Sequence, residues 1–281
     1  MDELEFYLAD LKSRFAGINP QDYYLSYSGG KDSHFLYWFI KEILHEDRIE
    51  IVAINTRMEY PQIMRRMYKY ADKVLLPQYT ISWVTEIYGT PCFSKHKDQY
   101  IAQYQHGKRT DALMSHILGV NPKTGQPTST FSLSERQREL LLSGKLHKIS
   151  PACCNITKKM TAHKYERESG KKAILGVRGS EGINRRTQYK SCFTKDRKFT
   201  PIYDLSTQLL NEANLRYNIE VPEIYNHIAR TGCMGCPYGY WHGDVEKELL
   251  LLNDAQRKYV ISLFSKSYDV LGVRYDDELF K

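Results

Sequence analysis

The stretch Ser28-Gly29-Gly30-Lys31-Asp32-Ser33 lies where an apolar, tyrosine-rich run at residues 23–27 gives way to a helical pattern of apolar residues. This order predicts a strand, a glycine turn and the start of a helix. The two glycines permit positive φ and close backbone approach, so consecutive N–H groups can point into one anion-sized hollow. The positive end of the helix adds to the field there, and Lys31 with the hydroxyls of Ser28 and Ser33 can contact the same anion. The stretch therefore predicts a phosphate-binding loop.

This loop is not the common phosphate loop, GxxxxGK followed by Ser or Thr, because no glycine lies at the required distance before Gly30. SGGKDS instead resembles the PP-loop of the ATP pyrophosphatase superfamily. The resemblance implies that the loop holds the β and γ phosphates of ATP, that the reaction takes place at the α phosphorus, and that pyrophosphate leaves. The residues assigned to the nucleotide here are Ser28, Gly29, Gly30, Lys31, Asp32 and Ser33. An ordinary strand-to-helix turn in a Rossmann-like domain is the alternative.

Length and composition indicate a globular protein. The chain has 281 residues, of which 42% are hydrophobic, enough to bury a full core. The N-terminus is acidic rather than basic and apolar, and the longest apolar run, residues 35–40, is far too short to cross a membrane. We therefore expect a cytoplasmic protein with no membrane partner.

The net charge of +7 is unevenly distributed along the chain. Residues 158–198 contain thirteen lysines and arginines and four acidic residues, whereas the rest of the chain is close to neutral. Such a block suits a polyanion, either a nucleotide or a nucleic acid backbone. A solvated, lysine-rich surface is the alternative interpretation.

Strands are expected at residues 23–26, 49–55, 74–76 and 173–177, alternating with helices. This alternation predicts an α/β fold with a doubly wound, mostly parallel sheet that binds ligands at the carboxyl edge of its strands. Residues 105–150 are turn-rich and polar, and we interpret them as a helical insertion. We expect a nucleotide-binding domain over residues 1–205 and a helical, cysteine-rich region over residues 206–281.

The edge that follows the second expected strand, residues 55–61, resembles the phosphoadenosine phosphosulfate (PAPS) reductase family. In that family a threonine at this edge lies near the adenine, so the resemblance assigns Thr56 to the nucleotide.

Residues 176–185 are similar to a second pattern of the same family, Gly-x-Arg-Ala-x-Glu-Ser-x-x-Arg. The resemblance assigns Gly176, Arg178 and Arg185 to the nucleotide, and both arginines can grip phosphate or sulfate bidentately. Gly182 stands where the family has serine, so the hydrogen bond of that hydroxyl is missing.

The six cysteines do not predict a disulfide framework in a chain expected to be cytoplasmic. Cys233 and Cys236 form a CxxC in a glycine turn, which presents two thiolates to one metal centre. Soft sulfur ligands suit iron–sulfur clusters or zinc. Buried structural cysteines are the alternative.

Together with the adjacent pair Cys153-Cys154, the CxxC again resembles the PAPS reductase family. Adenylylsulfate reductases of that family hold a four-iron cluster with a Cys-Cys and a CxxC, and the related DNA phosphorothioation enzymes also carry a cysteine-bound cluster. The side chains of adjacent residues point in different directions, so binding of both Cys153 and Cys154 to one cluster is geometrically demanding. The alternative is that one of the two binds together with Cys192, Cys233 and Cys236. The candidates for the four places are Cys153, Cys154, Cys192, Cys233 and Cys236.

The leading hypothesis is adenylyl transfer that activates an acceptor, with nucleic acid as the candidate acceptor, before sulfur transfer. It requires ATP, Mg²⁺ and a 4Fe-4S cluster, with a cysteine desulfurase or another sulfur donor as partner. Lys31, Asp32 and Arg178 are the predicted catalytic residues. Asp32 holds Mg²⁺ or the loop itself, while Lys31, Arg178 and the ion stabilise charge that develops on phosphorus.

Two other functions are compatible with the sequence. The first is reduction of an adenylyl sulfonucleotide, adenylylsulfate or PAPS. The thioredoxin-dependent reductases of the family use a cysteine in a C-terminal tail, and no cysteine follows Cys236 here. The second is an accessory protein that binds nucleotide or nucleic acid and carries a structural cluster.

Overall fold

The computed structural model describes residues 2–128 and 132–275 of the chain. The chain forms two compact units, each built from two separate segments. The sheet unit comprises Met1–Pro77 and Met160–Asn226, and the helical unit comprises Gln78–Lys159 and His227–Lys281. The chain thus passes between the units three times, at positions other than the predicted domain boundary at residues 205 and 206.

The sheet unit contains a sheet of four strands in the order β3-β2-β1-β4, all parallel. The strands are β1 (Tyr23–Tyr27), β2 (Glu50–Ile54), β3 (Lys73–Leu75) and β4 (Lys172–Leu175). In the centre of the sheet Leu25 lies opposite Ile51 on one side and Ile174 on the other. This arrangement confirms the predicted α/β fold with a parallel sheet. The strand order reverses beside β1, which is where ligands bind in open sheets of this kind.

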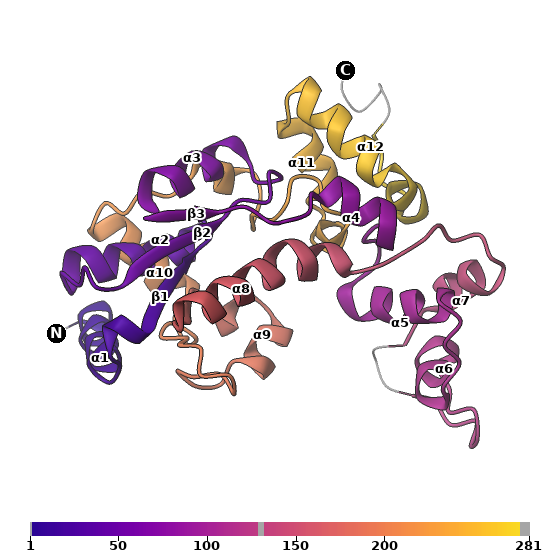
Figure 1. The fold of residues 1–281 in the computed structure, drawn as a ribbon, viewed down its shortest axis with the longest axis horizontal. Helices are drawn as coiled ribbons and strands as arrows, with labels where there is room; N and C mark the ends of the chain where they lie inside the picture. Colours follow the sequence, from indigo (N-terminus) through magenta and orange to yellow (C-terminus); the bar gives the residue numbers. More distant parts are fainter. Residues whose placement is uncertain (1, 129–131, 276–281) are drawn as a thin grey trace. The chain divides into compact units, whose positions relative to one another are not determined.

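Helices cover both faces of this sheet (Figure 1). Successive side chains of a strand point to opposite faces, and apolar side chains on both faces are buried by these helices. On one face Tyr24 packs with Val52, Ala173 and Tyr165, the last of which belongs to α8 (Met160–Ser169). On the other face the ring of Tyr27 contacts α2 (Lys31–Trp38) and α3 (Pro61–Tyr70). The sheet is therefore doubly wound, as predicted.

The sheet unit also contains two longer helices, α1 (Glu3–Ala16) and α10 (Thr207–Arg216), which pack on each other, and several short elements. α1 begins with a capping box between Asp2 and Glu5 and buries Leu4, Leu8, Leu11 and Phe15, which recur at helical spacing. A π-helical turn, η2 (Phe39–Ile43), extends α2. The other elements are η1 (Pro20–Asp22), η4 (Gly179–Glu181), α9 (Ile183–Gln188) and η5 (Glu223–Asn226).

The helical unit contains α4 (Ile81–Tyr88), α5 (Lys95–Gln105), α6 (Asp111–Leu118), α7 (Glu135–Leu142), η3 (Cys154–Lys159), η6 (Pro237–His242), α11 (Val245–Leu251) and α12 (Asp254–Leu271). The helices expected within residues 105–150 are α6 and α7. The strongly helical end of the chain also matches the prediction. Among residues 2–128 and 132–275, no helix combines the length and the apolar character needed to cross a bilayer.

Candidate functional site

The glycine loop, residues 28–30, joins the end of β1 to the first turn of α2, as the sequence predicts. Gly29 has φ +75°, and a Cβ at this position would lie 2.9 Å from both the carbonyl oxygen and Cγ2 of Ile63. Only glycine fits this conformation and this space without strain. The N-cap residue of α2, Gly30, has no side chain to cap the helix, so the first amides of α2 face the loop.

The hydroxyls of Ser28 and Ser33 fix the shape of the loop. Ser33 Oγ accepts a hydrogen bond from the Ser28 amide at 3.2 Å and lies 3.0 Å from both Ser28 Oγ and the carbonyl oxygen of Gly30. Ser28 Oγ in turn accepts from the Gly30 amide at 3.4 Å. Two amides of the loop therefore donate to hydroxyl oxygens, which are weaker acceptors than the oxygens of an anion.

Gly176 lies where the end of β4 passes the first turn of α2. A Cβ on this residue would stand 3.0 Å from the amide nitrogen of Ser33 and 3.1 Å from the carbonyl carbon of Asp32. The glycine thus permits close approach between the strand and the helix start. The structure brings this predicted site residue next to the loop.

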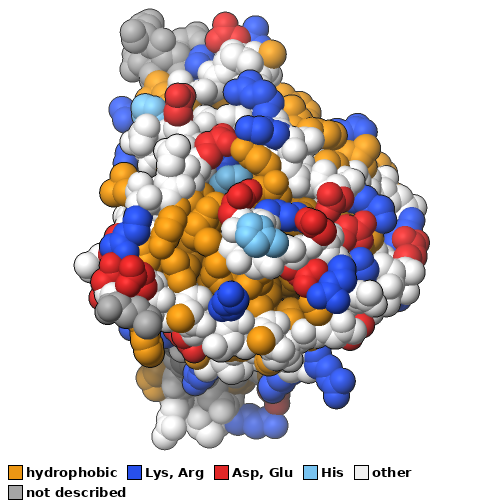
Figure 2. All heavy atoms as spheres, turned by 90° about the vertical axis from the view of Figure 1, so that its left-hand side faces the viewer, with side chains coloured by type: hydrophobic (Ala, Val, Ile, Leu, Met, Phe, Trp, Pro, Cys, Tyr) orange, Lys and Arg blue, Asp and Glu red, His pale blue; other side chains and the backbone are white. Residues whose placement is uncertain are grey.

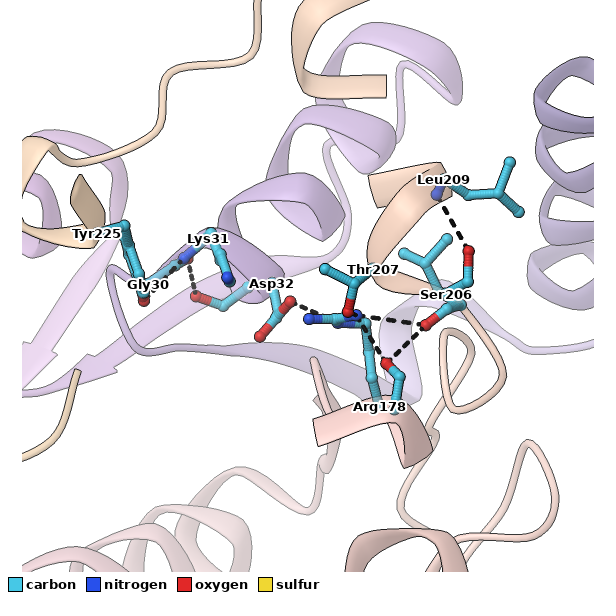
Figure 3. A network of polar contacts seen from close by, with 11 residues as sticks. Gly30, Lys31, Asp32, Arg178, Ser206, Thr207, Leu209 and Tyr225 are labelled. Atoms are coloured by element: carbon cyan, nitrogen blue, oxygen red, sulfur yellow. Dashed lines mark hydrogen bonds and ion pairs between the residues drawn. The ribbon is translucent and has the colours of Figure 1, made fainter. Parts of the chain in front are cut away.

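Arg178 follows two residues later and is almost fully buried, with 2% of its surface exposed. Its Nε donates to Asp32 Oδ1 at 2.6 Å, and Nη1 donates to the hydroxyls of Ser180 and Thr207 at 2.8 and 3.2 Å (Figure 3). The guanidinium that sequence reasoning assigned to phosphate therefore holds the first turn of α2. It also links that turn to the start of α10, whose N-cap is Ser206.

Thr56 and Arg185 occupy other parts of the sheet unit. Thr56 lies just beyond β2, where its amide and hydroxyl donate to the carboxylate of Glu59 at 2.9 and 2.8 Å. This places it at the carboxyl edge of the sheet, as predicted. Arg185 lies in α9, which follows Arg178 through η4.

Tyr225 contributes a contact that sequence reasoning did not identify. Its hydroxyl accepts a hydrogen bond from the Lys31 amide at 3.3 Å, and its ring lies 4.9 Å from the Lys31 ammonium (Figure 3). No pattern in the sequence links two residues 194 positions apart. The tyrosine nevertheless stands directly at the predicted phosphate loop.

The helical unit brings four of the five candidate cysteines near one another, while Cys192 belongs to the sheet unit. The hydrogen bond between Cys153 and Cys154 lowers the pKa of the Cys154 thiol to about 5 and raises the pKa of Cys153 well above its usual value. Burial, followed by the nearby thiols of Cys233 and Cys154, raises the pKa of Cys236. All six cysteines are described, and none is in a disulfide.

The chain around the CxxC is held tightly. Gly235 has φ +58°, its amide donates to the buried carboxylate of Glu248 at 2.8 Å, and its carbonyl accepts from the hydroxyl of Tyr268. Beside it, Tyr238 donates at 2.8 Å to Asp98, a carboxylate with no exposed surface. These contacts fix the turn between Cys233 and Cys236.

Cys92 lies in the core of the helical unit, where burial raises the pKa of its thiol. Lys95, Lys158 and Lys159 carry ammonium groups that favour the thiolate of Cys154.

Within the described ranges, no group of three or more His, Cys, Asp or Glu side chains has the arrangement required to hold a single metal ion. The four thiols therefore do not form a compact site for one ion such as zinc.

Local ion pairs neutralise part of the basic segment 158–198. Lys198 pairs with Glu166 at 2.7 Å, and Lys171 pairs with Glu50 at 3.2 Å. On the face drawn in Figure 2, basic and acidic side chains are interspersed with exposed apolar ones. At least two of the basic groups of this segment are thus neutralised by local carboxylates.

The fold and the loop together define an α/β protein with a glycine turn and a helix N-terminus at the carboxyl edge of a parallel sheet. No family model matches the chain, and no curated protein sequence does. Among solved structures, the chain is similar to a PAPS reductase from Candida auris in a phosphate complex, with a TM-score of 0.43 and 11% identity over 78% of this chain and 83% of that one. It is also similar to an NH3-dependent NAD synthetase from Campylobacter jejuni subsp. jejuni, with a TM-score of 0.38 and 13% identity over 95% of this chain and 94% of that one.

Proposed function

We propose that the sheet unit binds ATP through the loop Ser28–Ser33 and that the chain catalyses adenylyl transfer with release of pyrophosphate. The observation that carries this proposal is the geometry of the loop at the point where the strand order reverses. There the N-terminus of α2, its amides and Lys31 converge, which is the combination that holds phosphate in proteins.

In this proposal Lys31 and the loop amides bind the β and γ phosphates, while Arg178 is a positioning residue. Its buried ion pair with Asp32 orients that carboxylate at the first turn of α2. Mg²⁺ is usually held by one or two carboxylates together with substrate phosphates, so Asp32 beside bound phosphates fits this ion. When bound, the ion neutralises phosphate charge.

We propose that Cys153, Cys154, Cys233 and Cys236 hold a 4Fe-4S cluster. The four cysteines belong to one unit, and their thiols lie close enough to influence one another's pKa values. A four-iron cluster fits this donor set, because each thiolate binds a different iron. The cluster and the nucleotide loop are the basis for proposing that the activated acceptor receives sulfur from a donor such as a cysteine desulfurase. Nucleic acid is the proposed acceptor, and segment 158–198 is its proposed contact.

The experiment for adenylyl transfer uses anaerobically purified protein incubated with radiolabelled ATP and Mg²⁺, with and without nucleic acid. We expect AMP and pyrophosphate, and we expect Lys31→Ala to abolish both. Lys41→Ala is the matched control, because Lys41 lies in η2, away from the loop, and forms an ion pair with Asp47. Absence of pyrophosphate release under all conditions would contradict the proposal, because pyrophosphate leaves in the adenylyl-transfer step, whereas AMP stays attached to the acceptor until sulfur or water displaces it. Sulfite release from adenylylsulfate or PAPS with a dithiol would instead favour reduction.

The experiment for the cluster measures iron and acid-labile sulfide in single Cys→Ser variants. We expect Cys233→Ser to lose most of the iron, because it removes one of the four ligands. Cys192→Ser should keep the wild-type content, because Cys192 lies in the other unit. A wild-type protein without iron would overturn the cluster assignment and leave the adenylyl transfer proposal to its own test.

A further inference from the structure

Tyr225 makes two contacts with a single residue of the predicted phosphate loop. Its hydroxyl oxygen accepts the amide hydrogen of Lys31 at 3.3 Å, and its ring faces the Lys31 ammonium at 4.9 Å (Figure 3). Lys31 is the first residue of α2, so this amide is one of those that a helix cannot satisfy internally. The tyrosine therefore engages both groups with which Lys31 could bind an anion.

The hydroxyl oxygen of Tyr225 takes the place at the Lys31 amide that a phosphate oxygen would take. A charged oxygen is the stronger acceptor, and the N-terminus of a helix favours it further. The amide carries one hydrogen, so the hydroxyl and a phosphate compete for it. The ring and a phosphate compete in the same way for the ammonium, since a cation over a ring is a weaker pair than a cation with a phosphate.

The segment that carries Tyr225 is attached to the rest of the unit through the neighbouring residue. Tyr225 lies in the four-residue turn η5, beside Ile224, which is buried with 3% of its surface exposed. The amide of Ile224 also donates to Gln62 at 3.3 Å. Ile224 thus anchors the segment, whereas Tyr225 is only partly buried.

We propose that Tyr225 is a gate on the nucleotide site, whose hydroxyl and ring are displaced from Lys31 when the phosphates of a nucleotide bind. This inference rests on the proposed function of the loop and adds to it a residue that lowers the affinity of the site. It predicts that the loop binds pyrophosphate and nucleoside triphosphates more weakly than it would if Tyr225 did not contact Lys31.

The test measures the affinity of the full chain for inorganic pyrophosphate and for ATP with Mg²⁺ by isothermal titration calorimetry. Tyr225→Phe removes the competing oxygen and keeps the ring. We expect its dissociation constant for pyrophosphate to fall about threefold to tenfold, the effect of one hydrogen bond. Tyr217→Phe is the matched control in the same unit, because Tyr217 packs on Trp38 away from the loop contacts described above, and it should bind as the wild type does.

A second measurement follows the Tyr225 side chain itself, through nuclear Overhauser contacts between its ring protons and the side chain of Lys31 in the wild-type protein. Displacement of the ring should remove these contacts when pyrophosphate is added, and they should persist when a chain that does not bind pyrophosphate is treated in the same way. Unchanged or weaker binding by Tyr225→Phe, or ring contacts that persist in a wild type that binds pyrophosphate through Lys31, would overturn the gate. If Lys31→Ala binds pyrophosphate as well as the wild type does, the proposed function of the loop fails, and the gate fails with it.

Discussion

Arg178 and Asp32 are 146 positions apart in the sequence, and an ion pair of 2.6 Å joins them beneath the glycine loop. Their side chains are 2% and 16% exposed, so water screens the pair only weakly. Through Ser180 and Thr207 the same guanidinium reaches the start of α10. The loop is therefore held by residues from the second segment of the sheet unit as well as by its own strand and helix.

Arg178→Gln should destabilise the sheet unit by about 3 kcal/mol, because it leaves the Asp32 carboxylate partly buried without its charged partner. Urea unfolding monitored by circular dichroism measures this change. Arg216→Gln removes an exposed ion pair with Asp2 and should leave the unfolding midpoint unchanged. Equal effects of the two substitutions would show that the buried pair has no special role.

Gly176→Ala tests the close approach between β4 and α2. Its Cβ would stand 3.0 Å from the Ser33 amide nitrogen, so the helix start must move, and we expect a loss of about 2 kcal/mol together with weaker pyrophosphate binding. Gly17→Ala serves as control, because Gly17 has φ −83° and its Cβ would lie 3.4 Å from the nearest atom. A Gly176→Ala protein with wild-type stability and binding would contradict this account.

Gly235→Ala tests the cysteine turn, where the added Cβ would lie 2.3 Å from Val260 Cγ1 and 2.7 Å from the Tyr268 hydroxyl oxygen. Together with the positive φ, this crowding should cost about 2–3 kcal/mol and lower the iron content of anaerobically purified protein. Gly232→Ala changes the residue just before Cys233, where a Cβ would meet nothing within 4 Å. We expect it to retain both stability and iron, and matching iron losses in the two variants would refute the proposed role of the turn.

Asp98 should make the stability of the helical unit depend on pH. Burial raises the pKa of this carboxyl to about 6 from its usual 3.8, so the folded chain binds its proton more readily than the unfolded chain. Its contribution to stability is fully present below pH 3.8 and is lost as the pH rises through about 6. Asp98→Asn should remove this dependence, which urea unfolding of both proteins between about pH 4.5 and 7.5 would measure. A wild-type pH profile identical to that of the variant would show that Asp98 does not titrate in this range.

The parts of the fold that local sequence determines were predictable. The strand, glycine turn and helix around Gly29 follow from residues within a few positions of one another, and the structure confirms them. The four strands were also located, because buried parallel strands are continuous apolar runs. That the loop binds phosphate stays a prediction.

Long-range contacts were not predictable in the same way. The ion pair of Arg178 with Asp32 and the approach of Tyr225 to Lys31 depend on how distant segments fold together. Arginine at a family-like position suggested a phosphate contact, which stays a prediction, but the sequence contains no signal that its Nε donates to Asp32.

The division into units was missed for a related reason. The predicted boundary at residues 205 and 206 followed the end of the strand pattern, whereas α10 and η5 still pack within the sheet unit. For the same reason the sequence left five cysteines in competition, although Cys192 folds in a different unit from the other four.

The order of the strands also constrains how the chain acquires its nucleotide loop during synthesis. β1 lies between β2 and β4, and β4 ends at Leu175, after the whole first segment of the helical unit has been made. Because chains are made from the N-terminus, the edge of β1 that pairs with β4 stays without its partner while residues 78–159 emerge from the ribosome. Arg178, which holds Asp32, emerges later still. Nascent chains released before this point would expose a sheet edge and a loop without its anchor, which makes early termination products of this protein candidates for aggregation or proteolysis.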